Sequence, residues 1–239
     1  MPYEFLVLSV LFLVPGALIA GARPDLRGPM RRAMLFALPF AATEWLFYPA
    51  YWTPRFLFDL ADRLGFGLED VLFVAGLAAF SSTGYAVVFR QAVVARGTPP
   101  ERPVWRAVGA LGLVLGLAGL LRAVGVPILY AAVAAMVVGT AGLMGVRPDL
   151  GGPGLLGGGV SVVIYLGLCL LFAWLVPGVF ERTWRPSLLL PGRFLGVPWD
   201  ELLYGFGAGV AATAFPAWAF GYGFVPRRRG ALPAGPRSV

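Results

Sequence analysis

Two pairs of adjacent carboxylic acids stand out in this sequence, because each pair opens an otherwise apolar stretch. Glu69 with Asp70, and Asp200 with Glu201, are followed at once by aliphatic and aromatic residues. A carboxylate at hydrocarbon depth costs about 2.5–3.5 kcal/mol on insertion scales, so an acid placed there is a candidate for function. Burial and mutual repulsion allow one member of a pair to hold a proton while its neighbour stays ionised. The pattern therefore predicts general acids and bases.

A structural interpretation of the same acids stays open. Carboxylates in the first turn of a helix are favoured by the helix dipole, by about 0.3–1 kcal/mol. Such capping accounts for one acid per helix, but less well for the recurrence of both acids at two places.

A third acid, Glu44, lies in another apolar stretch beside Trp45. The second half of the chain has no acid at the matching place, around residues 168–172. Glu44 is either a functional acid or an interfacial one that pairs with Arg55 or Arg63, and the sequence leaves both interpretations open.

Aromatic residues gather near the acids. Most of them are typical of an interfacial belt. Phe73 and Tyr204 follow the two acidic pairs by one helical turn at matched positions, so they are predicted to line a site. Trp45 and Trp199 are further candidates for substrate binding, since aromatic ring faces attract positive charge.

The composition indicates an integral membrane protein. The 239 residues are 59% hydrophobic and only 13% charged, against about 25% charged in a soluble domain. The absence of histidine and the single Cys169 exclude imidazole-bound metals, Ser-His-Asp hydrolysis and a disulfide framework. The arginines stand between apolar runs, which argues against a nucleic-acid partner. We expect neither a cofactor nor a metal.

The expected fold is all-α, with about seven transmembrane helices. A membrane-spanning helix needs about 20 mostly apolar residues. The segments that meet this requirement are residues 3–21, 30–50, 68–89, 106–122, 125–146, 156–177 and 200–224.

An internal duplication organises these segments. Residues 23–29 match residues 147–153 at six of seven positions, and residues 64–73 pair with residues 195–204. Each unit then holds three helices, and an intervening helix makes the two units parallel in the membrane. The predicted divisions are a first repeat over 1–104, a linker helix over 105–124, a second repeat over 125–226 and a basic tail over 227–239.

Arginine counts predict the orientation. On the predicted topology, 13 arginines lie on the side opposite the N-terminus and 6 lie on the N-terminal side. By the positive-inside rule, the N-terminus is expected outside the cell membrane and the C-terminus in the cytoplasm.

Residues 64–73 and 198–203 resemble the Pro-x-Glu-Glu-x-x-Phe signature of the membrane lycopene β-cyclases. The segment from residue 44 to residue 70 also resembles the stretch that leads to this signature in the first family unit. The resemblance covers most of the chain. It implies packed transmembrane helices and a redox-neutral cyclisation, in which an acid protonates the end of a linear carotenoid, the cation closes a ring and a base removes a ring proton.

The resemblance implies that Glu69, Asp70, Asp200 and Glu201 form the acid–base set, without distinguishing acid from base. The chain departs from the signature by having Gly67 in place of the first proline, and by having one aspartate in each pair.

The expected function is that of a lycopene-type cyclase, which forms β-ionone rings. The expected partners are a lipophilic isoprenoid substrate, the lipid bilayer, and a second copy of the chain or other carotenoid enzymes. Two alternatives stay open on the sequence: a proton- or cation-coupled transporter, and a non-catalytic membrane subunit of isoprenoid biosynthesis.

Overall fold

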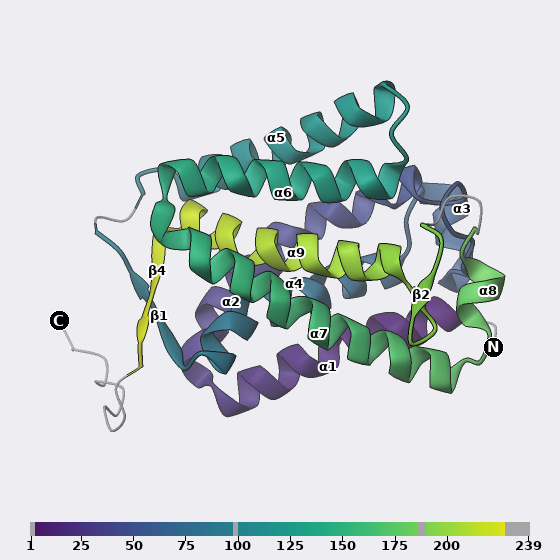
Figure 1. Cartoon of the computed structure of the whole chain (residues 1–239), viewed down its shortest axis with the longest axis horizontal. Helices are drawn as coiled ribbons and strands as arrows, with labels where there is room; N and C mark the ends of the chain where they lie inside the picture. The colour runs from purple at the N-terminus through teal and green to yellow at the C-terminus, as the bar shows by residue number, and fades with distance from the viewer. Residues whose placement is uncertain (1–2, 98–99, 186–189, 228–239) are drawn as a thin grey trace.

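The computed structural model describes residues 3–97, 100–185 and 190–227 as a bundle of helices that run along the long axis of the molecule (Figure 1). Within these residues, six helices are long and apolar enough to cross a membrane. The long helices are α1 (Glu4–Ala22), α4 (Leu68–Val88), α5 (Pro103–Ala123), α6 (Ile128–Val146), α7 (Gly151–Leu175) and α9 (Trp199–Ala219).

The predicted span over residues 30–50 is not one α-helix, and that part of the expectation is wrong. Helix α2 (Arg27–Ala37) gives way to the 3-10 helix η2 (Leu38–Leu46). Pro39 stands at this junction and has no N–H for an α-helical hydrogen bond, which explains the break. The described residues therefore hold six candidate spans rather than seven.

Short elements complete the two ends of the bundle, including strands that the sequence did not predict. Strands β1 and β4 pair antiparallel beside the C-terminal end of the described chain (Figure 1). The short elements are η1 (Pro24–Leu26), η3 (Leu57–Asp59), α3 (Leu60–Leu64), β1 (Gln91–Ala95), η4 (Pro148–Leu150), α8 (Val179–Thr183), β2 (Arg193–Phe194), β3 (Val197–Pro198) and β4 (Tyr222–Pro226).

The two Arg-Pro-Asp turns have the same geometry. Arg23 has φ −133° and ψ 74°, and Arg147 has φ −130° and ψ 74°. Each guanidinium forms an ion pair at 2.7 Å, Arg23 with Asp25 and Arg147 with Asp149. The hydrogen bond from Arg23 holds the pKa of Asp25 below its ordinary value. Both turns are therefore ordered by the same local contacts.

The same arginines also anchor the strand pair. Arg23 donates to the carbonyl of Gln91, and Arg147 donates to the carbonyl of Tyr222, both at 2.9 Å. In the strand register Val93 faces Phe224, and these two residues are 131 apart, as are Gln91 and Tyr222. The centre of this strand pair therefore joins two residues separated by the same 131 positions as residues 64–73 and 195–204.

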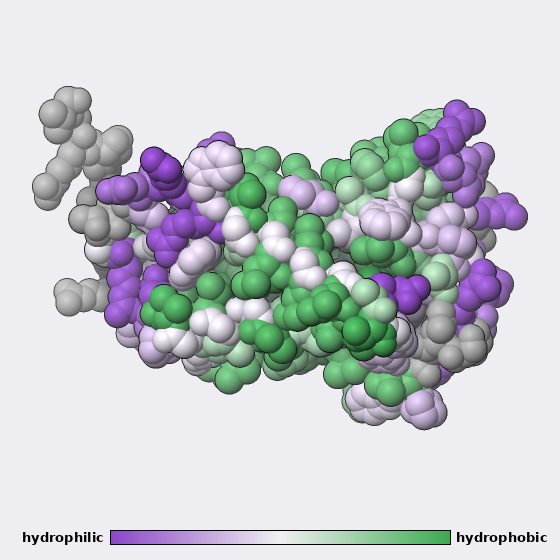
Figure 2. Space-filling view, turned by 90° about the horizontal axis from the view of Figure 1, so that it is seen from above, coloured by the Kyte–Doolittle hydropathy of each residue, from purple (hydrophilic) through white to green (hydrophobic). Residues whose placement is uncertain are grey.

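Helices α4 and α9 form the centre of the bundle and pack against each other. Helices α1 and α2 pack on α4, whereas α6 and α7 pack on α9. Helix α5 lies at the periphery against α6 and α9. Figure 2 shows hydrophobic residues over the middle of the molecule and most hydrophilic residues near its two ends, as expected of a bundle that crosses a bilayer.

Candidate functional site

The acidic pairs lie where α4 and α9 begin, at the same end of the bundle (Figure 1). All four side chains are buried. Gly67, in an extended conformation, precedes α4, and Pro198 precedes α9. The two helices therefore bring both pairs to one depth, as the sequence predicted.

The first acid of each pair holds a neighbouring loop. Oε1 of Glu69 accepts a hydrogen bond from the backbone N–H of Leu57 at 2.6 Å. Asp200 accepts one from the N–H of Leu190 at 3.0 Å and one from the hydroxyl of Tyr130 at 2.7 Å. Neither Glu69 nor Asp200 lines the cavity that the second acids face. Consecutive residues on a helix point about 100° apart. The first acid of each pair therefore faces a loop, and the second faces the cavity.

The second acids, Asp70 and Glu201, line one cavity together with Glu44. All three are buried. The cavity lies between α4, α9, α1, α7 and the segment around η2. Its aromatic wall includes Tyr51, Trp52, Phe73, Tyr165, Trp184 and Tyr204.

Glu201 accepts three hydrogen bonds from side chains. Oε1 receives the hydroxyl of Tyr51 at 2.9 Å and the indole N–H of Trp184 at 2.8 Å, and Oε2 receives the hydroxyl of Tyr165 at 2.6 Å. Burial raises the pKa of the Tyr51 phenol well above its ordinary value, so this hydroxyl stays a donor. Three donors at one carboxyl group satisfy its acceptor sites and fix its orientation.

Glu44 and Asp70 form a different arrangement on the other side of the cavity. Their carboxyl groups lie within hydrogen-bonding reach of each other. Oε1 of Glu44 also accepts the indole N–H of Trp52 at 2.6 Å, and Oδ2 of Asp70 accepts the backbone N–H of Gly67 at 2.7 Å. Two adjacent carboxyls in an apolar cavity do not both ionise readily, so they can share one proton.

These contacts bear on the two interpretations that the sequence left open. Asp70 caps α4 through Gly67 and also faces the cavity, so capping and exposure to the cavity coexist in one residue. Within the described part of the chain, the ion pairs include none between Glu44 and Arg55 or Arg63. The interfacial interpretation of Glu44 is therefore wrong.

Two of the four aromatic residues predicted to bind substrate line the cavity, and the other two do not. Phe73 and Tyr204 lie in the cavity wall. Trp45 is 64% exposed and Trp199 is 42% exposed, and neither lines the cavity.

Two residues that donate hydrogen bonds to Glu201, Tyr165 and Trp184, were not among the candidates predicted from the sequence. Trp52 and Trp184 each stand two residues before a proline, a shared pattern that could have identified the second tryptophan. Their rings lie 5.0 Å apart, and the two tryptophans form a backbone bridge. Tyr165 interrupts a long apolar run, which was its only signal.

The described residues contain no group of histidine, cysteine or acidic side chains that could hold a metal ion. The cavity instead offers carboxyls, phenols and indoles. Such groups can donate, accept and store protons next to an apolar ligand.

Residues 127–219 match the family model described as lycopene cyclase. Over these residues the chain is similar to the lycopene cyclase family. The matched range contains α6, α7, α8 and α9, and so includes the Glu201 side of the cavity. No curated protein and no solved structure matches the chain.

This similarity suggests an enzyme of the cyclase type. The six apolar helices, with this family, indicate a multi-pass membrane protein.

Proposed function

We propose that the protein is a redox-neutral carotenoid cyclase, an intramolecular lyase that closes a β-ionone ring at the end of a linear, lycopene-type carotenoid. The observation that carries the proposal is that Glu44, Asp70 and Glu201, all three buried, line one cavity with aromatic walls. We further propose that the reaction requires only proton transfers by these side chains.

The Glu44–Asp70 pair is the proton donor in this proposal. Because the two carboxyl groups are buried in the same cavity, one proton shared between them avoids two charges at one place. This proton adds to the terminal double bond of the substrate and leaves a carbocation on the neighbouring carbon.

Glu201 is the base. The π electrons of the nearby double bond attack the cation and form the ring bond, and the cation moves onto the ring. The ionised carboxylate of Glu201 then takes a proton from the ring and restores a double bond. No atom is gained or lost overall, and the proton returns to the pair before the next turnover. Phe73 and Tyr204 stabilise the cation, by about 0.5–2 kcal/mol for a ring face.

Glu69 and Asp200 act as positioning residues. Each carboxylate fixes a loop at the start of the helix that carries the catalytic acid. Trp45 and Trp199, which lie outside the cavity, belong to the interfacial belt.

The architecture that we propose consists of two parallel three-element repeats, over residues 1–104 and 125–226, joined by α5. Helices α1 and α6 begin and end 124 residues apart, and α4 and α9 begin and end 131 residues apart. The matched Arg-Pro-Asp turns and the β1–β4 register support the same division. The excess of arginines at the β1–β4 end supports an N-terminus outside the cell.

The test is expression in a bacterial host that accumulates lycopene, followed by chromatography of the pigments. We expect γ-carotene or β-carotene to appear with the wild-type chain. Unchanged lycopene, with the protein verified in the membrane fraction, would overturn the proposal.

A further inference from the structure

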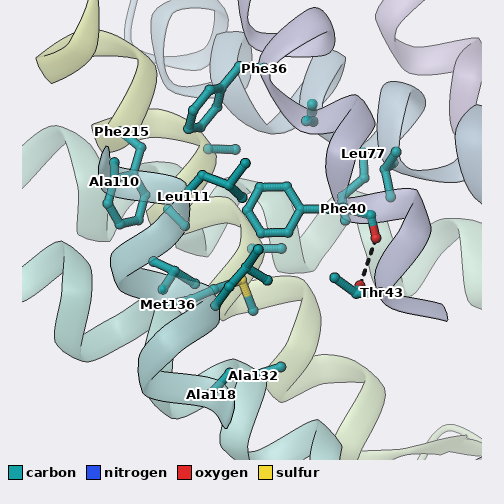
Figure 3. Close-up of a pocket in the computed structure, with 18 of the residues that line it drawn as sticks. Phe36, Phe40, Thr43, Leu77, Ala110, Leu111, Ala118, Ala132, Met136 and Phe215 are labelled. Carbon is teal, nitrogen blue, oxygen red and sulfur yellow. Dashed lines mark hydrogen bonds between the residues drawn. The ribbon is translucent and has the colours of Figure 1, made fainter. Parts of the chain in front are cut away.

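A second cavity, an apolar groove, adjoins the acid cavity. It runs between η2, α4, α5, α6 and α9 (Figure 3). The two share five lining residues, so they lie directly side by side. The shared residues are Phe40, Thr43, Phe47, Val74 and Tyr204.

The groove extends away from the acids along α9. Its α9 wall reaches from Tyr204 to Pro216. At 1.5 Å per helical residue this is roughly 18 Å. On α5 the wall reaches from Ala118, near the acids, to Ala110 at the far end, beside Phe215 (Figure 3). The groove is therefore long and follows the bundle axis.

Small apolar side chains form much of the wall. Ala110, Ala132 and Ala212 come from three different helices. No charged residue is among the described residues that line the groove. The hydroxyl of Thr43 donates to the carbonyl of Phe40 at 2.7 Å, which satisfies its donor (Figure 3). The groove thus suits an unbranched or methyl-branched hydrocarbon chain and offers little to a polar ligand.

We propose that this groove binds the unreacted remainder of the linear polyene and that its far end, around Ala110 and Ala212, determines the length of chain that is accepted. The inference rests on the proposed function. The wall shared with the acid cavity identifies the occupant, because a chain lying in the groove points one end group toward Glu44, Asp70 and Glu201. Only one end of the substrate reaches the acids at a time, so a symmetric substrate must leave and rebind before its second ring closes.

The experiment compares two substrates in purified protein reconstituted in lipid. Lycopene fills the groove, whereas ψ-ionone has the same end group and little chain beyond it. The ratio of the two cyclisation rates is measured for wild type, Ala110→Phe and Ala212→Phe. The control is Gly109→Phe, because Gly109 is exposed and a side chain there meets open space.

In both groove variants we expect the lycopene to ψ-ionone ratio to fall at least about tenfold, as steric exclusion from a binding pocket does. The ratio of Gly109→Phe is expected to equal that of wild type. The use of variants on two different helices guards against loss of folding in one of them.

An unchanged ratio in both folded variants would overturn the inference, and would leave the groove to a lipid chain or to helix packing. Equal losses on both substrates would also overturn it, since the short molecule does not reach the far end. Failure of wild type on both substrates would instead contradict the proposed function, so the two failures are distinguishable.

Discussion

Asp70 and Glu201 occupy matching positions in their helices, but their side chains have different partners. Both acids stand at the second position of an acidic pair in the first turn of a central helix. Glu201 is surrounded by three side-chain donors, whereas Asp70 meets a second carboxyl group, that of Glu44. In the proposed mechanism the surrounding groups, rather than the acids themselves, separate the base from the proton donor.

The residues that precede α4 and α9 also differ in the hydrogen bonds that they can form. Gly67 offers a backbone N–H, and Asp70 accepts it. Pro198 stands at the matching place and has no N–H to offer. A Cβ at residue 67 would also lie 2.6 Å from Oε2 of Glu69 and 2.7 Å from Cδ1 of Phe56. The departure of Gly67 from the proline of the signature is thereby explained by local packing.

The largest effect is expected from Glu201→Gln. An amide removes the ionised carboxylate but preserves the shape of the side chain, so cyclisation should fall by about 10³-fold, within the range for general acid–base catalysis. The measurement is the rate of lycopene conversion in isolated membranes. Glu181→Gln changes an exposed acid outside the cavity and is the control. Turnover that survives in Glu201→Gln would remove this residue as the base.

The next prediction concerns the shared proton. Glu44→Gln and Asp70→Asn should each lower the rate by about 10²-fold, because the remaining acid loses the neighbour that keeps it protonated. The double variant should be nearly as active as either single variant, as expected of residues that act as a unit. Independent, multiplicative losses would mean that the two carboxyls do not share one function.

Trp184 beside Glu201 and Trp52 beside Glu44 test the difference between the two sides of the cavity, with smaller expected effects on rate. Trp184→Phe removes one of three donors from Glu201 and should cost roughly tenfold in rate, since a hydrogen bond to a charged group contributes about 1.5–3 kcal/mol. Trp52→Phe should cost less, because Glu44 keeps its contact with Asp70. Trp174→Phe, at a 75% exposed position, is the matched control. A larger loss in Trp52→Phe than in Trp184→Phe would reverse the proposed roles.

The smallest effect on rate is expected from Glu69→Gln and Asp200→Asn. The amide oxygen still accepts the loop N–H, so the rate should change less than about threefold, while the free energy of unfolding falls by about 1 kcal/mol. Thermal unfolding in detergent and the conversion rate are measured together. A 10²-fold loss of rate with unchanged stability would place both residues in the acid–base set, as the family resemblance implies.

Much of the helical framework is predictable from the sequence because it depends on local patterns. Apolar runs mark α1, α4, α6 and α9, and the repeated Arg-Pro-Asp turn marks matched positions. The break between α2 and η2 was not predicted. Pro39 marks it in the sequence, but the segment as a whole is apolar and so resembles a single span. The β1–β4 pair was not predicted because even its central partners, Val93 and Phe224, are 131 residues apart.

By itself, the sequence determined that this chain is a helical, membrane-type protein with two pairs of acids at equivalent helix starts, since hydrophobicity and helix initiation depend on neighbouring residues. Only the tertiary structure decided which acids share a cavity. Glu44 reaches Asp70, and Glu201 meets Tyr51 from 150 residues away, through the packing of separate elements. Hydrogen bonds between side chains are short and directional, so no local pattern specifies which donor meets which oxygen.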